Sequence, residues 1–233
     1  MWPSQVLGSP RDAGTARAGG AAPPEARRMA GYSAIASVSD SLVWMLRTRI
    51  GEREGVLDID DTEIALGSPD ELADGADVRL GLYLYGISEY GHSKNSGRQR
   101  LDDDTLAQPP LELELAYLLT AYPARSGDET SKSHEQQAIL GLAMQVLQAN
   151  STLRGEDLRG TLTDDEPIHL ALEPQPISEI MQIWKTFRKV PFYPSVTYHV
   201  SPVLIDSTAV ETVPPVTDAS MEYGLGAGPD DDP

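Results

Sequence analysis

The sequence contains no cysteine among its 233 residues. This absence excludes disulfide bonds, thiolate metal sites and cysteine nucleophiles, and it is compatible with a reducing cytoplasm. Long apolar runs are also missing: none approaches the roughly 20 residues that a membrane span needs, and no apolar segment follows the N-terminal arginines as it would in a signal peptide. We therefore expect a protein that is assembled in the cytoplasm and has no membrane partner.

Lysine is scarce, with four residues in the whole chain. The 36 acidic residues outnumber the 18 lysines and arginines, so the formal net charge is −18. Such a surface repels phosphate backbones and anionic lipids, and no local basic patch offsets it, so we expect no nucleic-acid partner. Acidic excess with few lysines is also typical of a halophilic protein, because self-repulsion is screened where the Debye length falls to about 3 Å in 1 M salt. The other interpretation is an ordinary acidic protein.

The two ends of the chain and one internal stretch differ from the rest. Residues 1–29 are rich in Ala, Gly, Pro and Arg and lack apolar periodicity, which predicts a disordered or non-native extension; Met29 is an alternative start. Residues 208–233 are predicted to be an acidic, Pro/Gly-rich disordered tail. One folded domain is then expected over residues 30–207. Its long polar stretch, 91–110, has the length of a functional or disordered loop.

Apolar periodicity predicts three helices and four strands in this domain. Apolar side chains recur every three or four residues in the helices and every second residue in the strands. Ser133 and Gln136 have the spacing of a capping box at the start of the second helix. This order of elements predicts an α/β or α+β fold in which a single mixed β-sheet is packed by about three helices. The predicted helices are 35–51, 134–149 and 178–189, and the predicted strands are 78–85, 111–117, 168–172 and 195–200.

No arrangement of catalytic or metal-binding residues stands out. Three acidic clusters lack the residue order of a calcium loop, and motifs for nucleophiles, phosphate binding and dinucleotide binding are absent. We therefore expect no catalytic residue, no cofactor, no metal and no enzyme activity. The alternative is a carboxylate-dependent hydrolase that uses His92 or His199, because two carboxylates need only meet in space. None of the histidines has a metal-ligand spacing: they are His92, His134, His169 and His199.

Prolines flank the last predicted strand. Pro191 and Pro194 precede it and Pro202 follows its core. Proline cannot donate a hydrogen bond to a strand ladder, so this pattern favours the edge of a sheet. An edge strand is a template for a strand of another chain, which leads to the hypothesis that 195–203, or the alternating segment 111–119, pairs with a neighbouring protein. The other interpretation is an edge that proline merely shields.

Four segments are distinctive as a set: YSAIASVSDSL at 32–42, LELELAYLLTAY at 111–122, EQQAILG at 135–141, and ISEIMQIW at 177–184 followed by YPSVTYHVSPV at 193–203. Together they resemble the tube-cap, or tail-terminator, proteins of contractile injection systems of the antifeeding-prophage type. The resemblance covers about residues 30–207. The polar stretch 91–110 and both ends lie outside it.

This resemblance implies a structural protein of a phage-tail-like particle. Such a cap is expected to form a ring, of six subunits, on the last layer of the inner tube, to stop elongation and to anchor the last sheath ring. Its partners would be other copies of itself, the tube protein and the sheath protein, and it would be released from the cell with the particle. The alternatives are a terminator or connector of a contractile-tailed phage and an acidic module that binds a basic partner.

Apolar and aromatic side chains within the same segments are the expected contacts. We predict that they bind the sheath, the tube or a neighbouring subunit, because they belong to the segments that carry the resemblance and the strand pattern. The candidate interface residues are Leu111, Leu113, Leu115, Trp184, Phe192, Tyr193, Pro194, Val196, Tyr198 and Val200.

Overall fold

The computed structural model describes residues 31–53, 57, 59–75, 77–91, 99–102, 105–162, 167–207 and 210–212. The predicted extension 1–29, most of the predicted tail 208–233, and His92 lie outside these residues. None of the helices in this described part is both long and apolar enough to cross a membrane.

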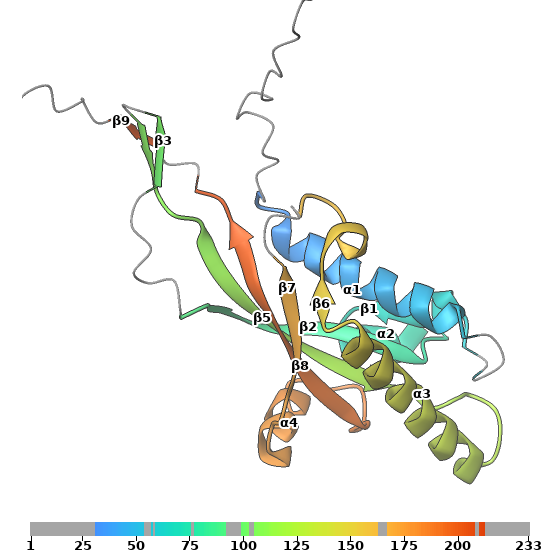
Figure 1. Ribbon diagram of the computed structural model, residues 1–233. Coiled ribbons are helices and arrows are strands. Elements are labelled where there is room, and N and C mark those ends of the chain that lie inside the picture. The colour runs from blue at the N-terminus through green and yellow to red at the C-terminus, as the bar shows by residue number, and fades with distance from the viewer. Residues whose placement is uncertain are drawn as a thin grey trace, which may run out of the picture.

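A curled, six-stranded mixed sheet forms the centre of the molecule (Figure 1). Only β1 and β2 run parallel, and every other neighbouring pair is antiparallel. Within the described residues four α-helices accompany the sheet, so the predicted α+β fold with one main mixed sheet is confirmed. In spatial order the strands are β1 (Ile64–Leu66), β2 (Leu80–Glu89), β5 (Leu111–Ala121), β8 (Ser195–Ile205), β7 (Ile168–Glu173) and β6 (Thr152–Leu153), and the helices are α1 (Ala34–Gly51), α2 (Pro69–Gly75), α3 (Glu129–Ala149) and α4 (Ile177–Trp184).

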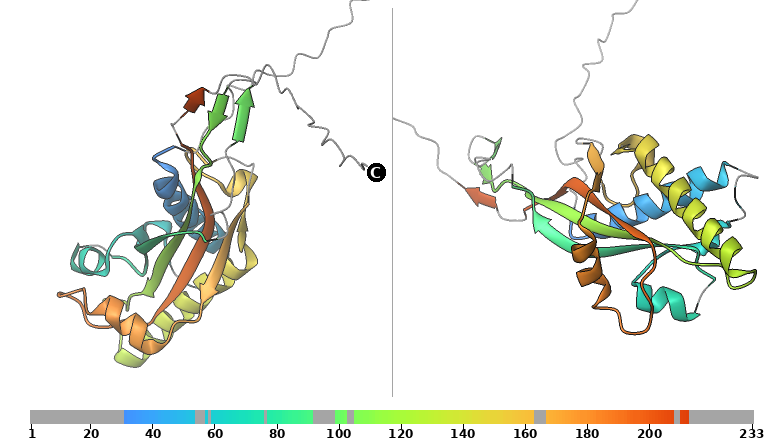
Figure 2. Two further views of the ribbon diagram at one scale, coloured as in Figure 1. Left: turned by 90° about the vertical axis from the view of Figure 1, so that its left-hand side faces the viewer. Right: turned by 90° about the horizontal axis from the view of Figure 1, so that it is seen from below.

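A second, three-stranded sheet extends from one end of the main sheet (Figure 2). It contains β3 (Gln99–Asp102), β4 (Thr105–Ala107) and β9 (Val210–Thr212), in the order β3-β4-β9. Because β4 pairs with β9 as β5 pairs with β8, the small sheet continues the central ribbon of the large one. The polar stretch 91–110 therefore supplies two strands, and β9 lies beyond residue 207, where the predicted domain ended.

Helices α1 and α3 cover one face of the main sheet and bury its alternating apolar side chains. In β5, Leu113, Leu115, Tyr117 and Leu119 point to this face and are buried. The predicted alternation thus produces the core, because successive side chains of a strand point to opposite faces. The helices contribute buried residues that include Val38, Leu42, Met45, Leu46, Ile139, Leu142 and Val146.

Helix α3 begins five residues earlier than predicted. Asp128 is its N-cap, and the carboxylate accepts hydrogen bonds from the backbone N–H groups of Thr130 and Ser131, both at 3.1 Å. The predicted capping box of Ser133 and Gln136 is therefore wrong. Since Gln136 lies inside the helix, its amide is free to donate a buried hydrogen bond of 2.7 Å to the carbonyl oxygen of Ala121, which ties α3 to the end of β5.

The two strands predicted as edges, 111–119 and 195–203, lie inside the sheet. Strand β5 pairs with β2 and β8, and β8 pairs with β5 and β7, so the edge prediction is wrong. The prolines have a local explanation. Pro194 precedes the first residue of β8, and Pro202 lies at an irregularity in the β5–β8 register, just past the last residue that pairs with β7. Proline is tolerated at both kinds of position.

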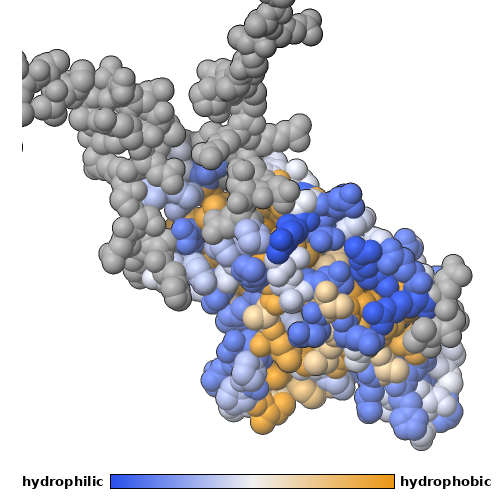
Figure 3. Space-filling model, in the orientation of Figure 1, coloured by the Kyte–Doolittle hydropathy of each residue, from blue (hydrophilic) through white to orange (hydrophobic). Residues whose placement is uncertain are grey.

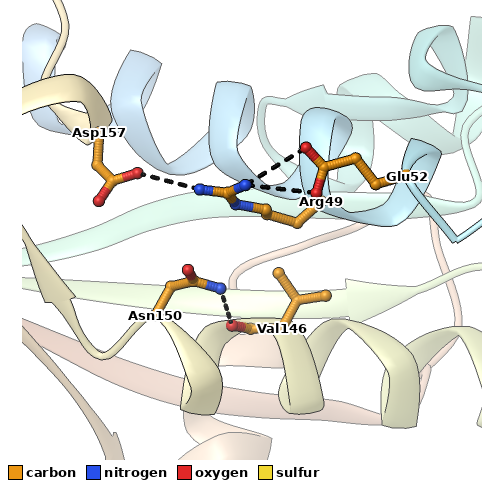
Figure 4. A network of polar contacts seen from close by, with 5 residues as sticks. All are labelled: Arg49, Glu52, Val146, Asn150 and Asp157. Atoms are coloured by element: carbon orange, nitrogen blue, oxygen red, sulfur yellow. Dashed lines mark hydrogen bonds and ion pairs between the residues drawn. The ribbon is translucent and has the colours of Figure 1, made fainter.

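The segment after α3 is fastened to α1 by hydroxyl groups. The Ser41 hydroxyl accepts a hydrogen bond of 2.8 Å from the backbone N–H of Arg159, whose guanidinium lies 3.4 Å from the centre of the Trp44 ring. Ser37 accepts one of 3.2 Å from Thr161. Close by, Arg49 of α1 forms ion pairs with Asp157 and Glu52, and the Asn150 amide donates to the Val146 carbonyl oxygen at the end of α3 (Figure 4).

Gly160 allows the segment after α3 to approach α1 closely enough for these hydrogen bonds. It has a φ of +68°, a conformation that L residues avoid, and a Cβ atom there would overlap the Ser37 hydroxyl. We expect Gly160→Ala to lower the free energy of unfolding by about 2–3 kcal/mol, because it adds left-handed strain and a clash. Denaturant unfolding measures the change.

Gly141→Ala is the matched control, since the same methyl group at this helical position meets nothing within 4 Å. It should raise the free energy of unfolding by about 0.5–1 kcal/mol, the helix propensity difference between glycine and alanine. Equal effects of the two substitutions would contradict the role of Gly160.

Tyr117 makes the core sensitive to alkali. Its ring is fully buried, its hydroxyl shares a 2.8 Å hydrogen bond with that of Ser39, and burial raises its pKa to about 12. The unfolded chain, with a tyrosine pKa of about 10, therefore loses the proton first, and stability falls as the pH rises from about 10 to 12. The loss from this group is about 2–3 kcal/mol. Urea unfolding at increasing pH should show a shallower decline in Tyr117→Phe, and an unchanged slope would contradict this account.

Candidate functional site

The second face of the main sheet is only partly covered. Helices α2 and α4 lie over one end of it, on the side opposite α1 and α3 (Figure 2). The approach of α2 is close because Gly81 has no side chain: a Cβ atom there would lie 2.8 Å from Leu72 of α2 and 2.9 Å from the Tyr122 ring. We call this the α2–α4 end of the sheet. No helix of the described residues lies over the remainder of the same face.

Aromatic side chains fill the space beneath α4. Trp184 is 4% exposed, and its ring contacts those of Phe187 and Phe192 edge-to-face, each with centroids 5.4 Å apart. Edge-to-face pairs add to the energy of burial. The cluster holds α4 against the sheet. Its apolar surface extends from the buried Trp184 to the exposed Phe192. Its members are Tyr83, Tyr122, Trp184, Phe187, Phe192 and Tyr193.

The predicted interface residues divide between core and surface. Buried side chains hold the fold and cannot contact a partner without rearrangement; they are Leu113, Leu115, Trp184, Tyr198 and Val200. Leu111 is exposed near the three-stranded sheet, whereas Phe192 is exposed at the α2–α4 end and Tyr193, Pro194 and Val196 next to it are half-buried. The structure therefore does not gather the ten residues into one surface.

Exposed apolar side chains are concentrated at the α2–α4 end. Space-filling shows an apolar surface around α4 and the adjoining strands (Figure 3). Helix α4 buries only one side chain, that of Trp184, although five of its eight residues are apolar. We define the α4 patch by the three large apolar residues exposed between the end of β7 and the start of β8: Ile177 at 64%, Met181 at 37% and Phe192 at 42%.

Three exposed cations adjoin this patch. They are Lys185, Arg188 and Lys189, in the turn after α4. The carboxylate of Asp70 in α2 accepts hydrogen bonds from the backbone N–H groups of Lys189 at 3.0 Å and Arg188 at 3.1 Å. These bonds lower the pKa of Asp70. Helix α4 ends at Trp184 and not at residue 189 as predicted: the N–H groups of Thr186 and Phe187 bond to carbonyl oxygens three residues back, and those of Arg188 and Lys189 bond to Asp70 in place of helix carbonyls.

The expectation that the chain has no local basic patch overlooks these cations, although their spacing, Lys-x-x-Arg-Lys at 185–189, is visible in the sequence. Two of the four lysines of the chain lie in these five residues. The role of Asp70 could not be found in this way, since only the fold brings α2 to the turn after α4.

The part of the same sheet face next to α4 is acidic. Tyr85 lies there, and its pKa is raised by burial and by the negative charges of Glu173, of Glu179 in α4, and of Glu114. His199 Nδ1 lies 3.1 Å from the Glu114 carboxylate across the β5–β8 pair. We call this region the acidic half of the face. The second face therefore has an apolar, cationic end and an acidic half.

Catalytic chemistry finds little support in this arrangement. His199 and Glu114 form a histidine–carboxylate pair, but in the described residues no hydroxyl group bonds to His199 as a nucleophile would. His134 and His169 are exposed. Among the described residues, no group of three or more histidine and acidic side chains is arranged to hold a metal ion. A hollow of about 380 Å³ beside Tyr122 and Tyr193 has arginines in its lining, but Arg125 pairs with Asp77 at 2.9 Å and Arg79 with Glu135 at 3.0 Å.

Comparison with known proteins adds a family and a fold. The family model described as the Pvc16 N-terminal domain matches residues 37–218. No curated protein gives a match.

Two solved structures of low sequence identity share the fold. One is the PVC sheath/tube terminator of an extracellular contractile injection system, in the extended state. Its TM-score is 0.56 and its sequence identity is 17%, and the match covers 84% of this chain and 65% of that chain. The other is the tube terminating cap of the anti-feeding prophage, with a TM-score of 0.52 and 19% identity over 80% of this chain and 60% of that chain. This chain thus spans less than two thirds of the length of either.

Trp184 should dominate the stability of the α2–α4 end. We expect Trp184→Ala to lower the free energy of unfolding by about 3–5 kcal/mol, as large buried aromatic side chains do. Phe192→Ala, at the exposed rim of the same cluster, should cost less than half as much. Denaturant unfolding followed by circular dichroism measures both. Equal losses would mean that Phe192 is as much a core residue as Trp184.

Proposed function

The chain belongs to the Pvc16 N-terminal domain family, and from this membership we propose that it caps the inner tube of a contractile injection system. The observation that carries the proposal is the family match over residues 37–218. The shared fold supports it, because the two similar structures are a sheath/tube terminator and a tube terminating cap. In this proposal the protein is structural and has no enzymatic role.

A cap of this kind acts through shape and contact. Copies of the chain form a ring, of six subunits, through heterologous contacts that close by rotation. One side of the ring matches the last layer of the tube and the other side offers no site for a further layer, so elongation stops by mismatch. The partners are further copies of the chain, the tube protein and the sheath protein. The ring becomes part of a phage-tail-like particle that is assembled in the cytoplasm and released with its cap.

Attachment of the sheath requires an accessible surface or a free strand edge. Strands β5 and β8 are paired on both sides along most of their length and cannot accept a further strand there. The small sheet has outer strands, β3 and β9, that each pair only with β4 among the described residues. An unpaired edge is a template for another chain. We therefore assign the sheath contact to the three-stranded sheet, in place of the strands expected from the sequence.

Particles assembled with and without this chain test the proposal. Deletion of its gene should give tubes of uncontrolled length with ends that lack a cap, because nothing then stops growth. Electron microscopy measures the length distribution, and expression of the wild-type chain in the deletion strain is the control that should restore it. Unchanged lengths and capped ends in the deletion strain would contradict a terminator role. Heads filled with DNA on the same tubes would favour the phage alternative.

A further inference from the structure

A ring of these chains faces an electrostatic obstacle. Each copy carries a formal charge of −18, and like charges held side by side repel one another. An interface can still form where local charges of opposite sign meet, since complementary patches both steer association and fix its register. The second face of the sheet carries two such patches on a single chain. The following inference rests on the proposed ring and identifies the surfaces that form it.

We propose that the α4 patch, with Lys185, Arg188 and Lys189 beside it, docks head to tail on the acidic half of the second face of another copy of this chain.

Exposure of apolar surface is the first reason. Helix α4 leaves Ile177 and Met181 exposed to solvent, half-buries Ile180 and Ile183, and fully buries Trp184. Phe192 continues this surface onto the loop before β8 and rests on the Trp184 ring. A contiguous apolar patch on a rigid element is typical of a surface that a protein partner covers. The aromatic cluster beneath it provides the rigidity.

The charge of the α4 patch indicates which kind of partner docks on it. Residues 177–192 carry one acid and three bases, a net charge of +2, whereas the rest of the chain carries −20. A partner for this patch should be acidic, and another copy of the chain meets that requirement. On the acidic half, Glu114 and Glu173 both act on the nearby Tyr85 and have partly exposed side chains, so a neighbouring subunit has access to them.

The two patches allow a head-to-tail contact. They are different surfaces of one chain, so docking the α4 patch of one copy on the acidic half of the next leaves the first copy's own acidic half open to a third copy, and a contact repeated in this way is heterologous. Heterologous contacts generate rings when the rotation closes. The backbone hydrogen bonds from Arg188 and Lys189 to Asp70 hold the cationic turn in place before docking, which reduces the ordering that association requires.

Two charge-reversed chains test this pairing. One carries Lys185→Glu and Arg188→Glu, so both of its patches are negative. The other carries Glu114→Lys and Glu173→Lys, so both are positive. Each should lose at least about tenfold in self-association, because like charges now meet. An equal mixture should assemble, since every contact in an alternating ring then joins opposite charges. Sedimentation velocity of the full chain in about 0.15 M salt, where the Debye length is about 8 Å, measures assembly.

Matched variants control for net charge and for apolar surface. The double substitution Arg53→Glu and Arg154→Glu changes the net charge by the same amount as Lys185→Glu and Arg188→Glu. Because these two arginines follow α1 and β6 and lie outside the proposed contact, this variant should still assemble. Met181→Asp should weaken it, whereas Ile87→Asp, at an apolar residue exposed by 53% far along β2, should not. Thermal unfolding by circular dichroism confirms that each variant is folded.

The outcomes separate this inference from the proposed function. If the wild-type chain forms rings and the reversed chains form them equally well, or if the folded mixture stays unassembled, the pairing is wrong and the cap role stands. If reversal leaves rings intact but abolishes their binding to tube ends, the α4 patch contacts the tube and the inference is overturned. If the wild-type chain forms no ring either alone or on tubes, both fail.

Discussion

Pairing of β5 with β8 is the constraint on which the rest of this structure depends. These two long strands lie at the centre of the sheet, and their facing residues, such as Leu115 with Val200 and Tyr117 with Tyr198, are buried under α1 and α3. The same ribbon continues into β4 and β9 and carries the three-stranded sheet away from the body. A one-residue shift in this register would expose the core side chains, so the register fixes both the core and the direction of the extension.

The two faces of the sheet differ in how completely they are covered. The face under α1 and α3 is a continuous apolar core, supplemented by hydroxyl groups such as Ser39 that bond within it. On the other face, α2 and α4 cover one end through an aromatic cluster and leave the remainder to polar and acidic side chains. A core on one face is enough for a stable α+β domain. The second face is therefore available for contacts with other chains.

The distribution of charge relates this asymmetry to assembly. An overall charge of −18 opposes the approach of one copy to another, so a site where the local charge changes sign favours contact between them. The turn after α4 is such a site, because its cations are held by the backbone bonds to Asp70 and lie beside exposed apolar residues. Membership of the Pvc16 N-terminal domain family, from which we propose a cap role, gives this arrangement its context.

The sequence by itself determined the elements and the family resemblance, since helical and strand periodicities are local and α1, β5 and β7 follow directly from them. Only the tertiary structure decided which strands are central, because the prolines around β8 fit a strand end and a register irregularity as well as an edge. It also decided that Asp128 and not Ser133 caps α3, since the two differ in which backbone groups they can reach. The site divides in the same way: the aromatic residues and the 185–189 cations are visible in the sequence, but their meeting with α2 and Asp70 depends on contacts between residues more than a hundred positions apart.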